Sequence, residues 1–280
     1  MMKLQRRKLI NYSVLALSSA AAVVGLLMLS WILGDVAIRG AGAINWDFFT
    51  ELPTPPGDGG GGVANAIVGT FLMTVIATLI AVPFGVLAGT YLAEFGKHTY
   101  VGTAARFVSD ILVSAPSIVV GVFVYLLLVK NMGNFSGWAG AVALAIIMLP
   151  VITRTTEEML RLVPKEMRES ALALGSPYWK MLVRVIYRSA ASGMITGIML
   201  AVARVAGETA PLLFTALNSP YWMHSINEPM ANMTVSLFNY AMSPYDDWHL
   251  KAWGMAFLIT VSVLVVTIIT RVTLHRRSHR

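Results

Sequence analysis

The chain has 280 residues, of which 56% are hydrophobic and only 12% are charged. Soluble domains carry about 25% charged residues, so this composition excludes an ordinary soluble enzyme and indicates an integral membrane protein. The absence of cysteine excludes disulfides and thiolate metal sites, and the net charge of +7 arises from basic residues at the ends of apolar runs, which argues against nucleic-acid binding.

The first predicted element is a membrane span over roughly 9–33, directly after a basic N-terminus. This apolar run is longer than the core of a signal peptide, about 7–15 residues, and it is long enough to cross a hydrocarbon layer of about 30 Å. We therefore expect it to be retained. The segment 34–62 that follows is polar and rich in proline and glycine, which predicts an external loop.

The rest of the chain predicts five further spans, which makes an all-α membrane protein with six transmembrane helices. We expect an N-terminal helix with its loop over 1–62, a transmembrane domain over 63–273 and a basic tail over 274–280. Pro83 and Gly85 predict a kink or a tilt in the second span. The expected spans after the first are 63–93, 107–129, 137–152, 190–213 and 252–270.

Lysine and arginine are distributed unevenly between the two sides of this layout. With the N-terminus inside, 17 of the 21 basic residues fall in inner segments, seven of them in the polar loop 154–188. Basic residues near span ends favour the cytoplasmic side. We therefore expect both termini and the 154–188 loop to be cytoplasmic.

The cytoplasmic loop contains the signals of a short helix over 164–175. Pro164 suits its first turn, Glu166 and Glu169 complement its positive end, and Gly175 suits its C-terminal cap. Met167, Ala171 and Leu174 have the spacing of a narrow apolar stripe. Two interpretations stay open at this point, an amphipathic helix on the lipid surface or a docking element for a cytosolic partner.

A charged pair lies inside the predicted fifth span. Arg204 and Glu208 are four residues apart, which predicts that they share one helix face, and such residues in a span usually face the protein interior or a water-filled path. Gly207 and Pro211 predict a weakened helix beside them. The pair is either an ion pair that fixes packing or a transient oxyanion site, since the planar donors of arginine match two oxygens.

Other polar residues predict less. Arg106 and Asp110 are expected to pair at the membrane edge, and Ser114 and Ser117 are as consistent with helix packing as with a transport path. The five histidines have no metal-ligand spacing, so no metal site is expected. The chain also has no Gly-x-x-x-x-Gly-Lys-Ser/Thr loop, so we expect no nucleotide site and no catalytic residues of its own.

Several motifs carry a family resemblance. The run Glu169–Gly175 resembles the Glu-Ala-Ala loop of ABC importer permeases, with Ser170 in place of the first alanine and Tyr187-Arg188 where the family usually has Leu-Pro. The chain from about Trp31 to Arg271 is also similar to the PstA-type permeases of phosphate-specific ABC importers. The motifs that carry this likeness are 114–121, 135–140, 154–157 and 204–217.

The resemblance implies a type I importer permease in the bacterial inner membrane. It implies a homologous second permease (PstC), two copies of an ATPase (PstB) that binds the ATP and Mg²⁺, and a phosphate-binding protein (PstS), with lipid around the spans. It also implies that Glu169, Ala171, Leu174 and Gly175 couple to the ATPase and that Arg204 and Glu208 act in phosphate passage. The alternatives are another oxyanion as cargo, an ion-coupled secondary carrier that titrates Glu208, or a membrane-bound enzyme.

Overall fold

A computed structural model describes the backbone of residues 2–278 and the side chains of residues 4–272, and this part of the chain is helical without strands. Five of its helices are long and apolar enough to cross a membrane, and a bent helix pair makes a sixth candidate. The prediction of an all-α membrane protein with six spans is therefore confirmed. The side chains of the predicted basic tail, 274–280, lie outside the described residues.

The centre of the bundle is the packing of α3 (Ala64–Glu94) against α7 (Gly137–Leu162). Small residues recur on α3 every fourth position, so one face of the helix lets a neighbouring backbone approach closely. A Cβ on Gly89 would lie 2.5 Å from the carbonyl oxygen of Thr153 on α7, which leaves room for glycine alone. The prediction of a span over 63–93 is confirmed, and the helix continues unbroken through Pro83.

The predicted third span is a broken helix. The helix α4 (Tyr100–Ser114) meets α5 (Ser117–Val124) at a bend of 106°, and the chain continues through the π-helical turn η1 (Tyr125–Val129) into α6 (Lys130–Met132). Pro116 explains the break, because a proline lacks the backbone N–H that would continue the helix and disfavours helical backbone before it. The span expected over 107–129 is thus a bent helix pair that begins earlier than predicted, at Tyr100.

The fourth span is longer than predicted, because α7 continues through Pro150 to Leu162. Close packing on Gly85 and Gly89 of α3 reaches Ile152, Thr153 and Thr156, on the far side of Pro150. Residues 154–162 are therefore helix rather than the beginning of a loop. Only 163–177 connects α7 to the next span, and it contains α8 (Lys165–Ala173).

The fifth span begins and ends earlier than predicted. It starts with α9 (Tyr178–Met181), passes through the π-helical turn η2 (Leu182–Ile186) and ends with α10 (Tyr187–Val205). The apolar residues after it form a separate short helix, α11 (Ala210–Leu213), since Gly207 and Pro211 favour a break. The following segment folds back over the bundle and contains α12 (Met233–Ala241).

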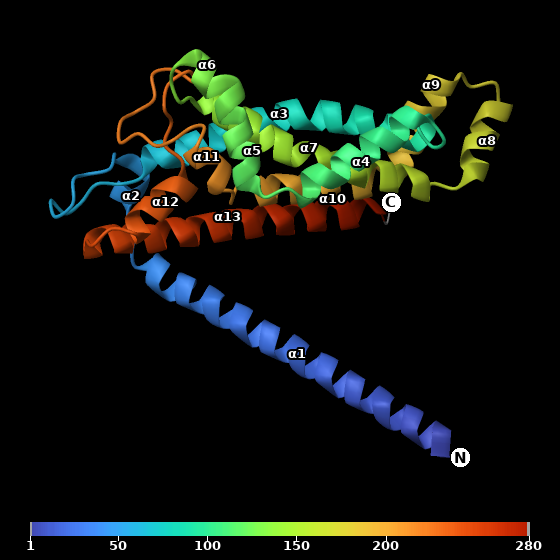
Figure 1. Ribbon diagram of the computed structural model, residues 1–280, viewed down its shortest axis with the longest axis horizontal. Coiled ribbons are helices and arrows are strands. Elements are labelled where there is room, and N and C mark those ends of the chain that lie inside the picture. Colours follow the sequence, from blue (N-terminus) through green and yellow to red (C-terminus); the bar gives the residue numbers. More distant parts are fainter. Residues whose placement is uncertain (1, 279–280) are drawn as a thin grey trace.

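The first and last long helices lie at the edge of the molecule. The last span, α13 (Asp246–Ser278), packs along the bundle, and α1 (Met2–Ala41) contacts it only near Gly40 and then extends away (Figure 1). A short helix, α2 (Trp46–Thr50), lies in the loop between α1 and α3. The start of α1 and the end of α13 lie toward the end of the molecule where α8 lies. The span expected over 9–33 is thus part of a 40-residue helix.

Candidate functional site: a charged helix end and a polar coupling region

Arg204 and Glu208 lie on either side of a helix end. Arg204 is in the last turn of α10, whereas Glu208 follows the helix in a turn closed by a hydrogen bond from its N–H to the carbonyl of Val205, 3.1 Å. The prediction that both residues share one continuous helix was wrong. They still form an ion pair, with Arg204 Nε 3.7 Å from Glu208 Oε1.

The two members of this pair differ in exposure. The Arg204 side chain is 48% exposed and the Glu208 side chain 17% exposed. A separation of 3.7 Å is beyond the usual hydrogen-bond range, so this is a loose electrostatic contact. The guanidinium therefore keeps donors that are free to meet another acceptor, and the carboxylate holds it in place from one side.

The backbone around Glu208 is held by two other elements. The hydroxyl of Thr234 on α12 lies 2.9 Å from the carbonyl of Glu208 and 3.0 Å from Asn232 Oδ1, and its single proton is shared between these two acceptors. On the other side, a Cβ on Gly121 of α5 would lie 2.7 Å from the Cα of Pro211, so α5 packs directly against α11. No pattern in the sequence indicated that the broken third span would pack beside this pair.

The short cytoplasmic-loop helix is confirmed with corrected bounds. Pro164 takes the N-cap position rather than the first helical one, and the helix has nine residues. Gly175 adopts φ +78°, and two hydrogen bonds close the end: its N–H donates to Leu172, 2.9 Å, and the N–H of Ser176 donates to Ala171, 3.3 Å. This is a Schellman cap, which strongly favours glycine at the left-handed position.

The predicted apolar stripe on α8 does not form one face. Leu174 lies beyond the helix end and is 89% exposed, whereas Ala171 packs inward against the cluster around Leu160 and Met181. Glu169 is exposed. The four residues assigned to ATPase coupling therefore divide: Glu169, Leu174 and Gly175 lie at the surface, and Ala171 contacts the bundle.

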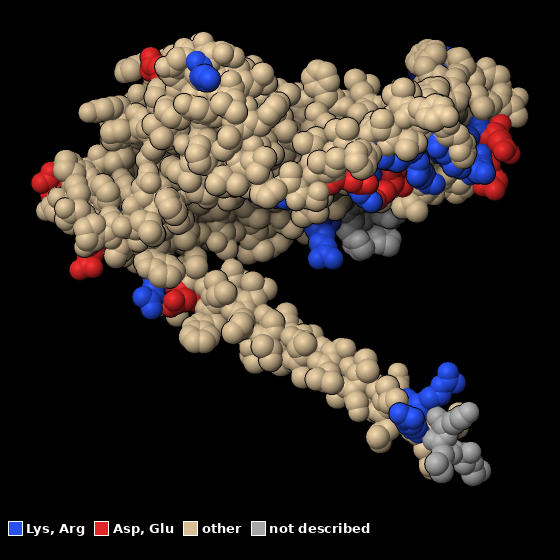
Figure 2. Space-filling view, viewed as in Figure 1, with Lys and Arg blue, Asp and Glu red and all other residues tan. Residues whose placement is uncertain are grey.

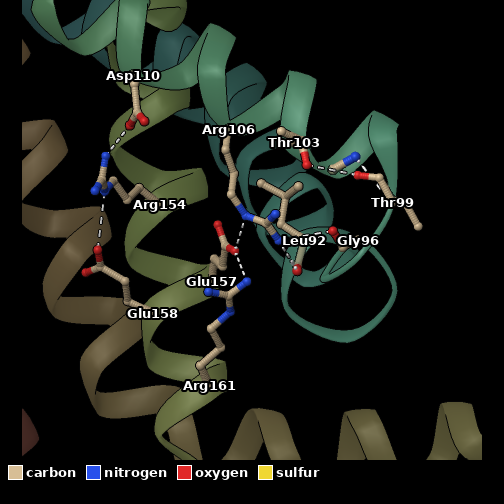
Figure 3. Close-up of polar contacts among 11 residues, drawn as sticks. Leu92, Gly96, Thr99, Thr103, Arg106, Asp110, Arg154, Glu157, Glu158 and Arg161 are labelled. Atoms are coloured by element: carbon tan, nitrogen blue, oxygen red, sulfur yellow. Dashed lines mark hydrogen bonds and ion pairs between the residues drawn. The ribbon is translucent and has the colours of Figure 1, made fainter.

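A network of charges links α3, α4 and α7 at the same end of the molecule (Figure 3). Arg106 on α4 pairs with Glu157 on α7, 2.8 Å, and donates to the carbonyls of Leu92 and Gly96 at the end of α3, 3.0 and 3.2 Å. Arg161 also pairs with Glu157, 2.6 Å. Arg106 on α4 is thus joined to α7 through the nearly buried carboxylate of Glu157 and to the end of α3 through two backbone carbonyls.

The second half of the network is more exposed. Arg154 on α7 pairs with Asp110 on α4 and with Glu158 one turn along its own helix, and all three side chains are more than half exposed. The expected Arg106–Asp110 pair is therefore wrong, because each residue pairs across to α7 instead. Figure 2 shows these charges gathered around α4 and α8, while the middle of the face in view is almost free of charge.

Comparison with protein families places the chain in a broad group of transport proteins. Residues 81–279 match the family described as binding-protein-dependent transport system inner membrane component. Solved structures agree at the level of fold. An inward-facing MetNI methionine ABC transporter aligns with TM-score 0.63 at 16% identity over 76% of this chain and 95% of that one. An amino acid ABC transporter crystal structure aligns with TM-score 0.54 at 17% identity over 75% and 92%.

Curated relatives are much closer in sequence. The phosphate transport system permease protein PstA of Yersinia pestis is 47% identical over 96% of this chain and 91% of its own length. PstA of Xylella fastidiosa is 50% identical over 97% and 95%, and PstA of Haemophilus influenzae 48% over 95% and 94%. The chain belongs to the PstA family of inner-membrane permeases, and it has the fold of type I ABC importer permeases.

Proposed function

We propose that this chain is a permease subunit of an ATP-driven importer that carries inorganic phosphate across the inner membrane. The observation that carries the proposal is its likeness to the named phosphate permeases over nearly its full length, at 47–50% identity. The remaining parts of the importer would be PstC as the second permease, two copies of PstB as the ATPase, and PstS as the phosphate-binding protein. ATP and Mg²⁺ would be bound by PstB.

Arg204 is the residue we assign to the passing phosphate. Its Nε faces Glu208, and the two terminal guanidinium nitrogens can present paired N–H groups to two oxygens of an oxyanion. A guanidinium whose partner is 3.7 Å away needs little rearrangement to accept such a ligand. Glu208 then keeps the cation from holding the anion too tightly, since like charges repel, and release becomes possible.

The α8 region is the part we assign to the ATPase. Its outer surface carries the exposed apolar side chains of Leu172 and Leu174, and the charges around it contrast with the apolar middle of the molecule. The start of α1 and the end of α13 point to the same end as α8 (Figure 1), which supports the positive-inside assignment of that end to the cytoplasm. Closure of the ATPases would move α8 and, through it, the spans that expose Arg204 to one side or the other.

Two other functions remain as defined alternatives. The same architecture could carry a different oxyanion, since the donors of Arg204 do not select phosphate by themselves. An ion-coupled carrier would instead use Glu208 as a titrating group. The C-terminal cap and the exposed apolar residues of α8 favour an ATP-driven importer over an ion-coupled carrier, because a carrier needs no docking element for a cytosolic partner.

The test is uptake by the whole complex in vesicles. Phosphate uptake is measured with and without ATP, with an excess of sulfate, and with a protonophore, beside an Arg204→Gln variant. We expect uptake that requires ATP, resists sulfate and the protonophore, and falls at least 100-fold in the variant.

Each arm can contradict a separate part of the proposal. ATP-independent uptake that the protonophore abolishes would show that the protein is an ion-coupled carrier. Full competition by sulfate would show that phosphate is not the specific cargo. Unimpaired uptake by the Arg204→Gln variant would contradict the assignment of phosphate contact to Arg204, but it would not contradict the importer function.

A further inference from the structure

One arginine of α8 points inward, and nothing in the proposed function uses it. Arg168 donates from Nη1 to the carbonyl of Val163, 2.6 Å, and from Nη2 to the carbonyl of Leu160, 2.6 Å, and to Glu94 Oε1, 3.0 Å. Its side chain is 19% exposed and that of Glu94 is 5% exposed. The guanidinium thus joins α8 to the last turn of α7 and the last residue of α3.

The same carboxylate also reaches the next span. Tyr178 at the start of α9 donates its hydroxyl to Glu94 Oε2, 2.7 Å, so both oxygens of Glu94 are engaged from different elements. The apolar packing of α8 is slight by comparison, since Ala171 is the α8 residue that packs against the neighbouring hydrophobic cluster. Most of the directional contact between α8 and the bundle therefore passes through Arg168 and Glu94.

We propose that Arg168 is the positioning residue that transmits movement of α8 to α3 and α7, with Glu94 and Tyr178 carrying it on to the fifth span. This inference rests on the proposed function, because it assigns a role within the same ATP-driven cycle. An arginine suits the task, since its planar donors hold two carbonyls and a carboxylate at once in fixed directions. A lysine is a single point charge and holds fewer of these acceptors in place.

The functional test separates transmission from docking. In the reconstituted complex, Arg168→Gln is compared with Arg184→Gln, an exposed arginine in η2 that provides the same substitution nearby. We measure ATPase association, ATP hydrolysis and phosphate uptake. We expect Arg168→Gln to keep ATPase association within about twofold of wild type, while the amount of phosphate carried per ATP hydrolysed falls at least tenfold. Arg168→Lys should recover part of this phosphate-to-ATP ratio. Arg184→Gln should leave the ratio unchanged.

Two outcomes of this functional test would overturn the proposal. An unchanged phosphate-to-ATP ratio in Arg168→Gln would show that the contact does not transmit movement. A parallel loss of association, hydrolysis and uptake would show that Arg168 serves docking or folding of α8 instead. Failure of the wild-type complex to import phosphate with ATP would count against the proposed function and would be visible before any variant is compared.

A second experiment measures the position of α8 directly and does not depend on which anion the complex carries. Because the chain has no cysteine, spin labels can be placed at Lys165→Cys on α8 and Tyr100→Cys at the start of α4, both exposed positions. In the full complex we expect a narrow distance distribution for the otherwise unchanged chain and one at least twice as broad with Arg168→Gln. Equal widths would contradict the proposal whichever anion the complex carries.

Discussion

The polar contacts at the α8 end and the pair near the end of α10 are built in opposite ways. Arg106 and Arg168 each combine one carboxylate with two backbone carbonyls at helix ends, and their carboxylate partners are almost buried. Arg204 has one carboxylate at 3.7 Å and is half exposed. The first two guanidiniums have most of their donors engaged, whereas the third does not.

The difference separates cations whose contacts to their own protein are fixed from a cation that can exchange its partner. A buried ion pair with good hydrogen bonds resists breaking, since removing one partner leaves a charge without solvent or counter-ion. A loosely paired, half-exposed arginine contributes little to folding and can exchange its partner for an anion. Stability measurements should therefore show a larger loss when Arg106 is replaced than when Arg204 is replaced.

The largest loss of stability is expected for Arg106→Gln. The change removes one of two cations from Glu157 and leaves the carbonyls of Leu92 and Gly96 without their donor. Because Arg161 still faces Glu157, we expect the free energy of unfolding to fall by about 2 kcal/mol, less than the full cost of leaving a buried charge without a partner. The loss is measured by unfolding the purified permease in mixed micelles with increasing amounts of denaturing detergent and recording helix content by circular dichroism.

Arg154→Gln is the matched control for this prediction. Arg154 also bridges α4 and α7, but its side chain and that of Asp110 are each 56% exposed. Exposed pairs contribute less than about 1 kcal/mol. Equal losses from the two variants would show that burial and carbonyl contacts do not distinguish the two bridges.

An intermediate effect is expected for Gly175→Leu. A leucine at φ +78° costs about 1–2 kcal/mol, and relief of that strain would break the Schellman cap of α8. We expect α8 to fray and ATPase association to weaken about tenfold, as measured by pull-down at graded ATPase concentrations. Gly133→Leu is a suitable control, since Gly133 has the same φ at the end of α6, at the other end of the molecule from α8 (Figure 1). Unchanged association in Gly175→Leu would contradict the docking role of α8.

Local signals were sufficient for some elements and not for others. The length of apolar runs predicted the spans, and Pro164 with Gly175 predicted α8, because caps and hydrophobicity act over a few residues. The continuation of α7 to Leu162 could not be predicted this way, since tertiary packing at Gly89 holds a polar helix turn that looks like a loop. The break between α4 and α5 coincides with Pro116, but no local pattern in the sequence predicted a bend of 106°.

The charged sites show the same division. Spacing four residues apart correctly predicted that Arg204 and Glu208 interact, even though the helix ends between them. The same rule failed for Arg106 and Asp110, because a better partner on α7 faces each of them. Sequence spacing predicts which residues can meet along one helix, and it says nothing of the competing residues that another helix brings. Arg168 was missed as an inward contact for this reason.

The smallest stability effect is expected for Arg204→Gln, the variant with the greatest expected effect on uptake. Its ion pair is long and half exposed, so we expect a change within about 0.5 kcal/mol in the same detergent titration. Glu208 keeps its backbone hydrogen bond from Thr234, so the turn should persist without the cation. A loss above 1.5 kcal/mol would mean that the pair fixes packing between α10 and α11, and the uptake defect would then follow from misfolding. A stable protein without transport would instead place the function of Arg204 in its free donors, which is what its geometry leaves available.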